Sequence, residues 1–308
     1  MRGIRTSILR LLFAVPVLLG AAPPDYLPLQ NGNSWLYLPG PVASGVSGTE
    51  KIGSFTYSVT SLLGREYRLR RADDNTVYQY HLDTQKEDVF LAFGAEEGQS
   101  FPTSIDPCVS SARIVSKAEK FSGPLGDFDT VLHIAFTPSC ADAGLSDGWF
   151  LPYIGLIRYQ TETIAGPRTF DLTYSKTGIV EVSSGMVSTK ASISLPVSTT
   201  VQVRLAVANS AGTPVVLQFS NGQRFDMQLK NEKGDVVGIW SLGTLFIQTP
   251  GTEAVSPGGE RSWAISMPLR DLPPGTYSAE AWLTAANVPP RAFSASIAFE
   301  IPVPAPGP

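Results

Sequence analysis

The sequence has little charge, few histidines and few cysteines, and each shortage excludes a class of function. Charged residues make up 16% of the 308 residues and the formal net charge is −4, so we expect neither nucleic acid nor an anionic membrane as a partner. The two histidines, His81 and His133, fall inside predicted strands, whereas a serine triad needs a histidine base beside a sharply presented serine nucleophile. Phosphate-binding, dinucleotide-binding and calcium-binding loop motifs do not occur either. We therefore predict a protein that is not an enzyme and that uses no cofactor or metal.

Helical patterns are nearly missing after the first 22 residues, where apolar residues alternate with polar ones instead. Phe225, Met227 and Leu229 share one face of a predicted strand, and Val201 begins a similar alternation that continues to Val207. A period of two residues is typical of a half-buried strand. Any helix would be short, near residues 141–145. The sequence therefore predicts an all-β protein.

Turn-forming residues separate the alternating runs in the C-terminal third. Asn221-Gly222 can supply the positive φ of a hairpin turn, and Pro257-Gly-Gly259 and Pro273-Pro-Gly275 interrupt the chain in the same way. Short strands at this spacing favour an immunoglobulin-like β-sandwich over residues 191–303. The aromatic residues expected to form most of its core are Phe219, Phe225, Trp240 and Tyr277.

Residues 1–22 have the order of a secretory signal peptide. Arginines precede an apolar run that begins at Leu11, and small residues end the segment at Ala22. The apolar run is too short to span a bilayer comfortably, and alanines occupy the place where a lipoprotein would need a cysteine. We expect an exported protein, periplasmic or extracellular, without a transmembrane anchor after cleavage.

The two cysteines, Cys108 and Cys140, lie in the same N-terminal unit. In an exported protein they can form a disulfide, which is the interpretation that we prefer. The alternative is a pair of unrelated buried thiols. A zinc site is disfavoured because no neighbouring histidines complete four ligands.

The chain before the sandwich forms a separate β-rich unit, which we place at residues 23–178. Its strand signals favour a curved antiparallel sheet or a partly open barrel. Residues 179–190 are small and polar enough to link the two units, although they could equally form a strand that begins the second one. The last five residues, 304–308, read as an extended proline-rich tail.

The C-terminal third contains a series of short motifs that keep a fixed order along the chain. They are Phe219-Ser-Asn-Gly-Gln223, Phe225-Asp226, Gly234, Trp240-Ser241, Phe246, Pro257-Gly-Gly-Glu260, Trp263, Leu272-Pro-Pro-Gly-Thr-Tyr277 and Leu283-Thr-Ala285. On these motifs the chain resembles the BsuPI-type intracellular proteinase inhibitors over about residues 201–301. The resemblance implies a sandwich that acts by binding a serine protease. The N-terminal unit resembles, more weakly, a β-rich domain type of exported bacterial proteins. That resemblance rests on the opening at residues 26–37 and the segment at residues 148–159.

Three non-enzymatic functions fit these features. The first is an exported binding protein that inhibits a proteinase through its BsuPI-like domain, with a serine protease or another envelope protein as partner. The second is a structural or ligand-binding envelope protein that uses the sandwich only as a scaffold. The third is a carrier that holds an apolar ligand in the curved N-terminal sheet.

Overall fold

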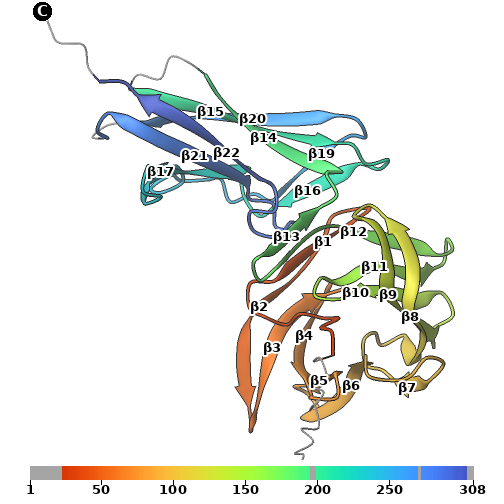
Figure 1. The fold of residues 1–308 in the computed structure, drawn as a ribbon. Coiled ribbons are helices and arrows are strands. Elements are labelled where there is room, and N and C mark those ends of the chain that lie inside the picture. The colour runs from red at the N-terminus through yellow and green to blue at the C-terminus, as the bar shows by residue number, and fades with distance from the viewer. Residues whose placement is uncertain (1–22, 195–198, 270–271, 304–308) are drawn as a thin grey trace, which may run out of the picture.

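The computed structural model describes residues 23–194, 199–269 and 272–303, which form two bodies of β-sheet (Figure 1). The predicted signal peptide, residues 1–22, and the predicted tail, residues 304–308, lie outside the described residues. The described part contains strands and no helix, which confirms the all-β prediction. The short helix expected near residues 141–145 is wrong, because Ala143–Leu151 forms strand β10.

The N-terminal body is one antiparallel sheet in which neighbouring strands are mostly consecutive in sequence. The order is β6-β5-β4-β3-β2-β1-β12-β11-β10-β9-β8-β7, with β13 paired to β12. The strands are β1 (Ser34–Leu38), β2 (Val42–Ile52), β3 (Phe55–Leu62), β4 (Arg65–Arg71), β5 (Thr76–His81), β6 (Lys86–Ala92), β7 (Ser100–Pro102), β8 (Val109–Gly123), β9 (Gly126–Pro138), β10 (Ala143–Leu151), β11 (Gly155–Thr163), β12 (Arg168–Thr177) and β13 (Val180–Ser183).

The sheet curves until its two ends meet. Just after β7, the backbone N–H of Ser104 donates to the carbonyl of Val89 in β6 at 2.8 Å, and the hydroxyl of Thr103 donates to the carbonyl of Phe90. These bonds occupy polar groups that an open sheet edge would leave unpaired. The predicted curved sheet or partly open barrel is therefore confirmed as a nearly closed barrel.

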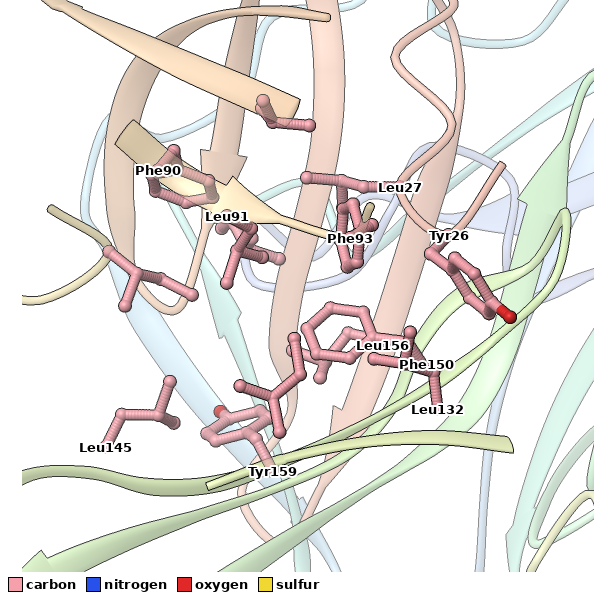
Figure 2. Packing of buried hydrophobic residues seen from close by; sticks show 14 of the residues in the cluster. Tyr26, Leu27, Phe90, Leu91, Phe93, Leu132, Leu145, Phe150, Leu156 and Tyr159 are labelled. Atoms are coloured by element: carbon pink, nitrogen blue, oxygen red, sulfur yellow. The ribbon is translucent and has the colours of Figure 1, made fainter. Parts of the chain in front are cut away.

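Side chains pack the inside of this barrel. Leu91 and Phe93 lie toward Phe150 and Leu156, and Tyr26 lies beside Phe93 with ring centroids 5.6 Å apart (Figure 2). Phe93 meets Phe150 edge to face, with ring centroids 5.2 Å apart. Close packing of this kind makes the interior a hydrophobic core. It gives no support to the idea of a carrier for an apolar ligand.

The opening and closing motifs of the N-terminal unit contact each other across the sheet. The indole N–H of Trp35 donates to the carbonyl of Ile154 at 2.6 Å, and the hydroxyl of Tyr37 donates to the carbonyl of Leu156 at 2.8 Å. Asn33 accepts from the backbone N–H of Gly178 at 2.9 Å. The two motifs thus hold the beginning of the unit against its end.

Cys108 and Cys140, which we expected to be bonded, are joined by a disulfide. It connects the segment before β8 to the segment after β9, and these two strands are already paired. The bond therefore fixes one end of a long hairpin.

The C-terminal body consists of three smaller antiparallel sheets that enclose a second core, and it confirms the sandwich. Thr189 and the carbonyl of Ser294 join the edges of two of these sheets by a hydrogen bond of 2.5 Å. One sheet has the order β14 (Val187–Ser194), β15 (Thr200–Asn209) and β20 (Glu260–Pro268); the second pairs β16 (Val215–Phe219) with β19 (Gly251–Val255); the third has the order β18 (Val236–Ile239), β17 (Phe225–Asn231), β21 (Gly275–Leu283) and β22 (Ser294–Ile301).

Burial along the strands follows the predicted alternation in β15 but not in β17. Val201, Val203, Leu205 and Val207 are buried as expected. In β17 the whole run from Phe225 to Leu229 is buried, so Asp226 and Gln228, which the alternation places on an outer face, are covered as well. A second layer of contacts must therefore lie over that face.

Residues 179–190, which we expected to link the two units, hold β13 and the beginning of β14. Apolar side chains of the first sheet, Leu36, Leu38 and Tyr174, belong to the core cluster of the C-terminal body. Asn287 also donates to the carbonyl of Pro41 at 3.4 Å. The residues before position 179 therefore contact residues after position 190. The boundaries of the two units, 23–178 and 191–303, stay a prediction.

Within the described residues, no helix is long and apolar enough to cross a membrane.

Candidate functional site

The most unusual surface of the protein is the loop between β18 and β19, residues 240–250, which we call the β18–β19 loop. It leaves the edge of one small sheet and enters another, and from residue 244 to residue 250 it has no regular secondary structure. Leu242, Leu245 and Ile247 expose 82%, 98% and 76% of their surface. Because exposed side chains of this size forgo about 1.5–3 kcal/mol each relative to burial, several of them in one loop make the loop a candidate binding surface.

A buried carboxylate holds the start of this loop. Asp226 accepts hydrogen bonds from the backbone N–H of Ser241 at 3.2 Å and from the Ser241 hydroxyl at 2.6 Å. It also accepts from the backbone N–H of Met227 at 2.8 Å. These bonds satisfy a charge that would be costly to bury alone, and they explain why Asp226 is covered although the alternation places it on the outer face.

Aromatic rings pack the loop against β17. Trp240 stacks on Phe225 with ring centroids 5.7 Å apart, and the ring of Phe246 is tilted against Trp240 with ring centroids 5.6 Å apart. The backbone N–H of Trp240 donates to the carbonyl of Met227 at 2.8 Å. Phe246 is thus turned inward, while its neighbours Leu245 and Ile247 are turned to solvent.

The far side of the loop is fixed by Gly222. Its backbone N–H donates to the carbonyl of Ile247 at 2.7 Å, and a Cβ at this position would lie 3.3 Å from the same carbonyl oxygen. The hairpin turn predicted at Asn221-Gly222 is wrong: neither residue has a positive φ, and β16 pairs with β19 instead of β17. Glycine at this position leaves room for another segment of backbone to approach closely.

An ion pair fastens the base of the loop. Arg224, two residues after Gly222, donates from Nε to Glu253 of β19 at 2.7 Å and from Nη1 to the carbonyl of Asn221 at 2.6 Å. Thr244 donates its backbone N–H to the carbonyl of Ser241 at 2.9 Å. The loop is consequently held at its start, middle and end, while its apolar side chains stay free.

The two histidines occupy different surroundings, and neither is bonded to a nucleophile in the described part of the chain. His133 lies between Glu119 and Asp147, with nitrogen–oxygen distances of 2.6 and 2.9 Å, and stacks on Trp149 at 4.5 Å. His81 lies 3.2 Å from Asp88. Burial lowers the pKa of His133, but the hydrogen bond with Asp147 and the charge and hydrogen bond of Glu119 outweigh it, so its pKa is raised.

The described residues contain no group of three side chains suited to hold a metal ion.

The comparison with known families decides what the C-terminal body resembles. Residues 187–288 match the family described as intracellular proteinase inhibitor, BsuPI. The resemblance expected from the motifs is confirmed for this third of the chain. The match begins at β14, earlier than the motifs indicated. It includes the β18–β19 loop and also Gly222 and Asp226, which contact the loop. A search of curated proteins finds no match to the chain.

Sequence reasoning identified the residues that hold the loop but not the loop itself. Phe225-Asp226, Trp240-Ser241, Phe246 and Gly222 all appeared as motif residues, whereas Leu242, Leu245 and Ile247 did not. A signal was present, because residues 236–250 contain no charged residue and are largely apolar, yet they do not alternate regularly. Apolar content without a period of two can indicate an exposed binding loop as well as a core segment.

Proposed function

We propose that this protein is an exported, non-enzymatic proteinase inhibitor whose C-terminal sandwich binds a serine protease through the β18–β19 loop. The observation that carries the proposal is the position of this rigid, apolar loop inside the stretch that matches the inhibitor family, residues 187–288. A protease cleft binds extended chain segments. A loop that is already held in place loses little conformational entropy on binding, and this preorganisation favours affinity.

Inhibition of this kind needs no catalytic residues in the inhibitor. Protease–inhibitor interfaces bury about 1,600 Å² in total and are among the tightest complexes known. The central contacts come from a few residues that fill pockets on the partner. Leu242, Leu245 and Ile247 are suited to that role, because each carries an apolar side chain that solvent reaches on most of its surface.

Export is the second part of the proposal. It is supported by the order of arginines, apolar run and small residues in the first 22 positions. The bond between Cys108 and Cys140 also suits an oxidising compartment. Mass spectrometry of the secreted protein should find a new N-terminus near Pro23. Retention of Met1 on cell-associated protein would contradict export.

The inhibitory function is tested with the purified full chain against a panel of serine proteases. We expect inhibition of at least one protease in the nanomolar range, and strong weakening when Leu242, Leu245 and Ile247 are all replaced by serine. The matched control replaces three exposed apolar residues that precede the matched residues 187–288, Leu82, Ile164 and Ile179. Absence of inhibition across the panel, or equal loss in both variants, would contradict this function.

A second function fits the size of the N-terminal unit. This unit has its own core and lies outside the matched residues 187–288. The protein could then serve as a structural or ligand-binding envelope protein with the sandwich as a scaffold. Native mass spectrometry of the exported protein would favour this function if it showed a bound lipid or an envelope protein and the protease panel gave no inhibition.

A further inference from the structure

Residues 236–250 carry no charged side chain, although the chain on either side of them is charged. Lys233 and Asp235 precede this stretch, and Glu253 follows it. Trypsin, a serine protease that cuts after lysine or arginine, holds a carboxylate in the main pocket that receives the substrate side chain, whereas chymotrypsin has an apolar pocket there. A loop without charge is therefore complementary to an apolar pocket.

Leu245 is the residue in this loop best placed to enter such a pocket. It is 98% exposed, and the residues around it are held by Phe246 against Trp240 and by Ile247 against Gly222. The backbone on both sides is thus fixed while the leucine side chain projects from it. This is the arrangement of a substrate-like segment that a protease can bind without rearranging it.

We propose that Leu245 occupies the main specificity pocket of the target, and that the target is a serine protease with a large apolar pocket. This inference rests on the proposed inhibitory function and adds the residue and the class of partner. Thr244 and Phe246 then flank the pocket, with Thr244 tied to Ser241 by its backbone N–H at 2.9 Å. Leu242 and Ile247 contact the rim of the cleft.

The experiment measures inhibition constants of the full chain against chymotrypsin, whose pocket is apolar, and against trypsin, whose pocket holds a carboxylate. Wild-type protein should inhibit chymotrypsin and compete with a small peptide substrate. Leu245→Ala should weaken this inhibition by about 10- to 100-fold, which is what the loss of a buried leucine side chain predicts. Leu245→Arg should abolish chymotrypsin inhibition and create inhibition of trypsin.

Ile164 supplies the matched control, because it is an apolar side chain of the N-terminal unit with 90% exposure. Ile164→Ala and Ile164→Arg should leave the inhibition constants within about twofold. Thermal unfolding of each variant shows that it is folded, which is expected since both positions are exposed.

The possible results separate the inference from the function on which it rests. A wild-type protein that inhibits no protease overturns both. Inhibition that survives Leu245→Ala and Leu245→Arg overturns the role of Leu245 and leaves the inhibitory function standing. If sedimentation shows a dimer that Leu245→Arg converts to a monomer with unchanged inhibition, the loop is an interface between two copies of the chain, and the inference is wrong.

Discussion

The carboxylate of Asp226 binds Ser241 twice, through its backbone N–H at 3.2 Å and through its hydroxyl at 2.6 Å. Asp226 belongs to β17, in the middle of a sheet, and Ser241 opens the β18–β19 loop. The pair therefore transmits the rigidity of the sheet to a segment without regular structure. A hydrogen bond to a charged group contributes about 1.5–3 kcal/mol, so this contact is strong enough to limit how the loop moves.

Ser241→Ala should loosen the loop without unfolding the sandwich. We expect faster hydrogen exchange at the amides of residues 242–247, because local opening becomes easier when an anchoring bond is lost. Inhibition should weaken by about tenfold, in line with one lost bond of this kind. Ser266→Ala, at an exposed position of β20, is the matched control and should change neither quantity. Unchanged exchange in Ser241→Ala would show that the bond between the Ser241 hydroxyl and Asp226 does not hold the loop.

Phe225→Ala should be among the most destabilising changes in the sandwich. The ring is buried and stacks on Trp240 at 5.7 Å, and loss of a core aromatic ring costs about 3–5 kcal/mol. Lys230→Ala, on the same strand, removes a partly exposed ion pair with Glu280 at 2.7 Å. Such pairs contribute about 0–1 kcal/mol. Urea unfolding of the full chain measures the free energy of unfolding of both variants. Equal losses of stability would show that the face of β17 that carries Phe225 does not point into the core.

The alternation of residues predicted the buried face of β15 correctly, but it could not predict which strands pair. Val201 and Val207 are buried as their period of two indicates. The same period says nothing about which strands pair. The sequence therefore predicts that β16 turns back onto β17, whereas in the structure β16 pairs with β19. Strand pairing depends on contacts between residues far apart in sequence, and a single sequence contains no direct record of them.

Burial of Asp226 and Gln228 was missed for a related reason. Local alternation places both on the solvent face, but Ser241 covers the first, and Glu280 and Arg291 bind the second at 2.8 and 3.2 Å. These partners lie on other strands and loops. The sequence thus predicted the motif residues of the candidate site but not its geometry. Which side chains of the loop are exposed depends on contacts with other strands and loops, and a single sequence does not show these contacts.

The disulfide should stabilise the N-terminal barrel independently of the inhibitory loop. Cys108 and Cys140 close a segment with a sequence separation of 32 residues, for which the chain-entropy model gives about 3–4 kcal/mol. A variant with both cysteines replaced by serine should lose roughly that amount in urea unfolding and keep its inhibition constants. Thiol labelling of denatured, non-reduced protein should find no free thiol. Two labelled cysteines in the wild type would contradict the bond.

The last prediction concerns the charge of His133, which lies between Glu119 on β8 and Asp147 on β10. Burial opposes the charged ring, but Asp147 and Glu119 together raise the pKa of His133 above its ordinary value. A raised pKa in the folded state means that protonation stabilises the fold. The stabilisation is fully present below the unfolded value of about 6.5 and is lost as the pH rises through the higher folded value. His133→Gln should remove this dependence, so the difference in free energy of unfolding between wild type and variant should shrink as the pH rises from about 6 to about 9. An NMR titration of the ring would measure the pKa directly, and a value at or below the ordinary one would show that Glu119 and Asp147 do not hold His133 as a cation.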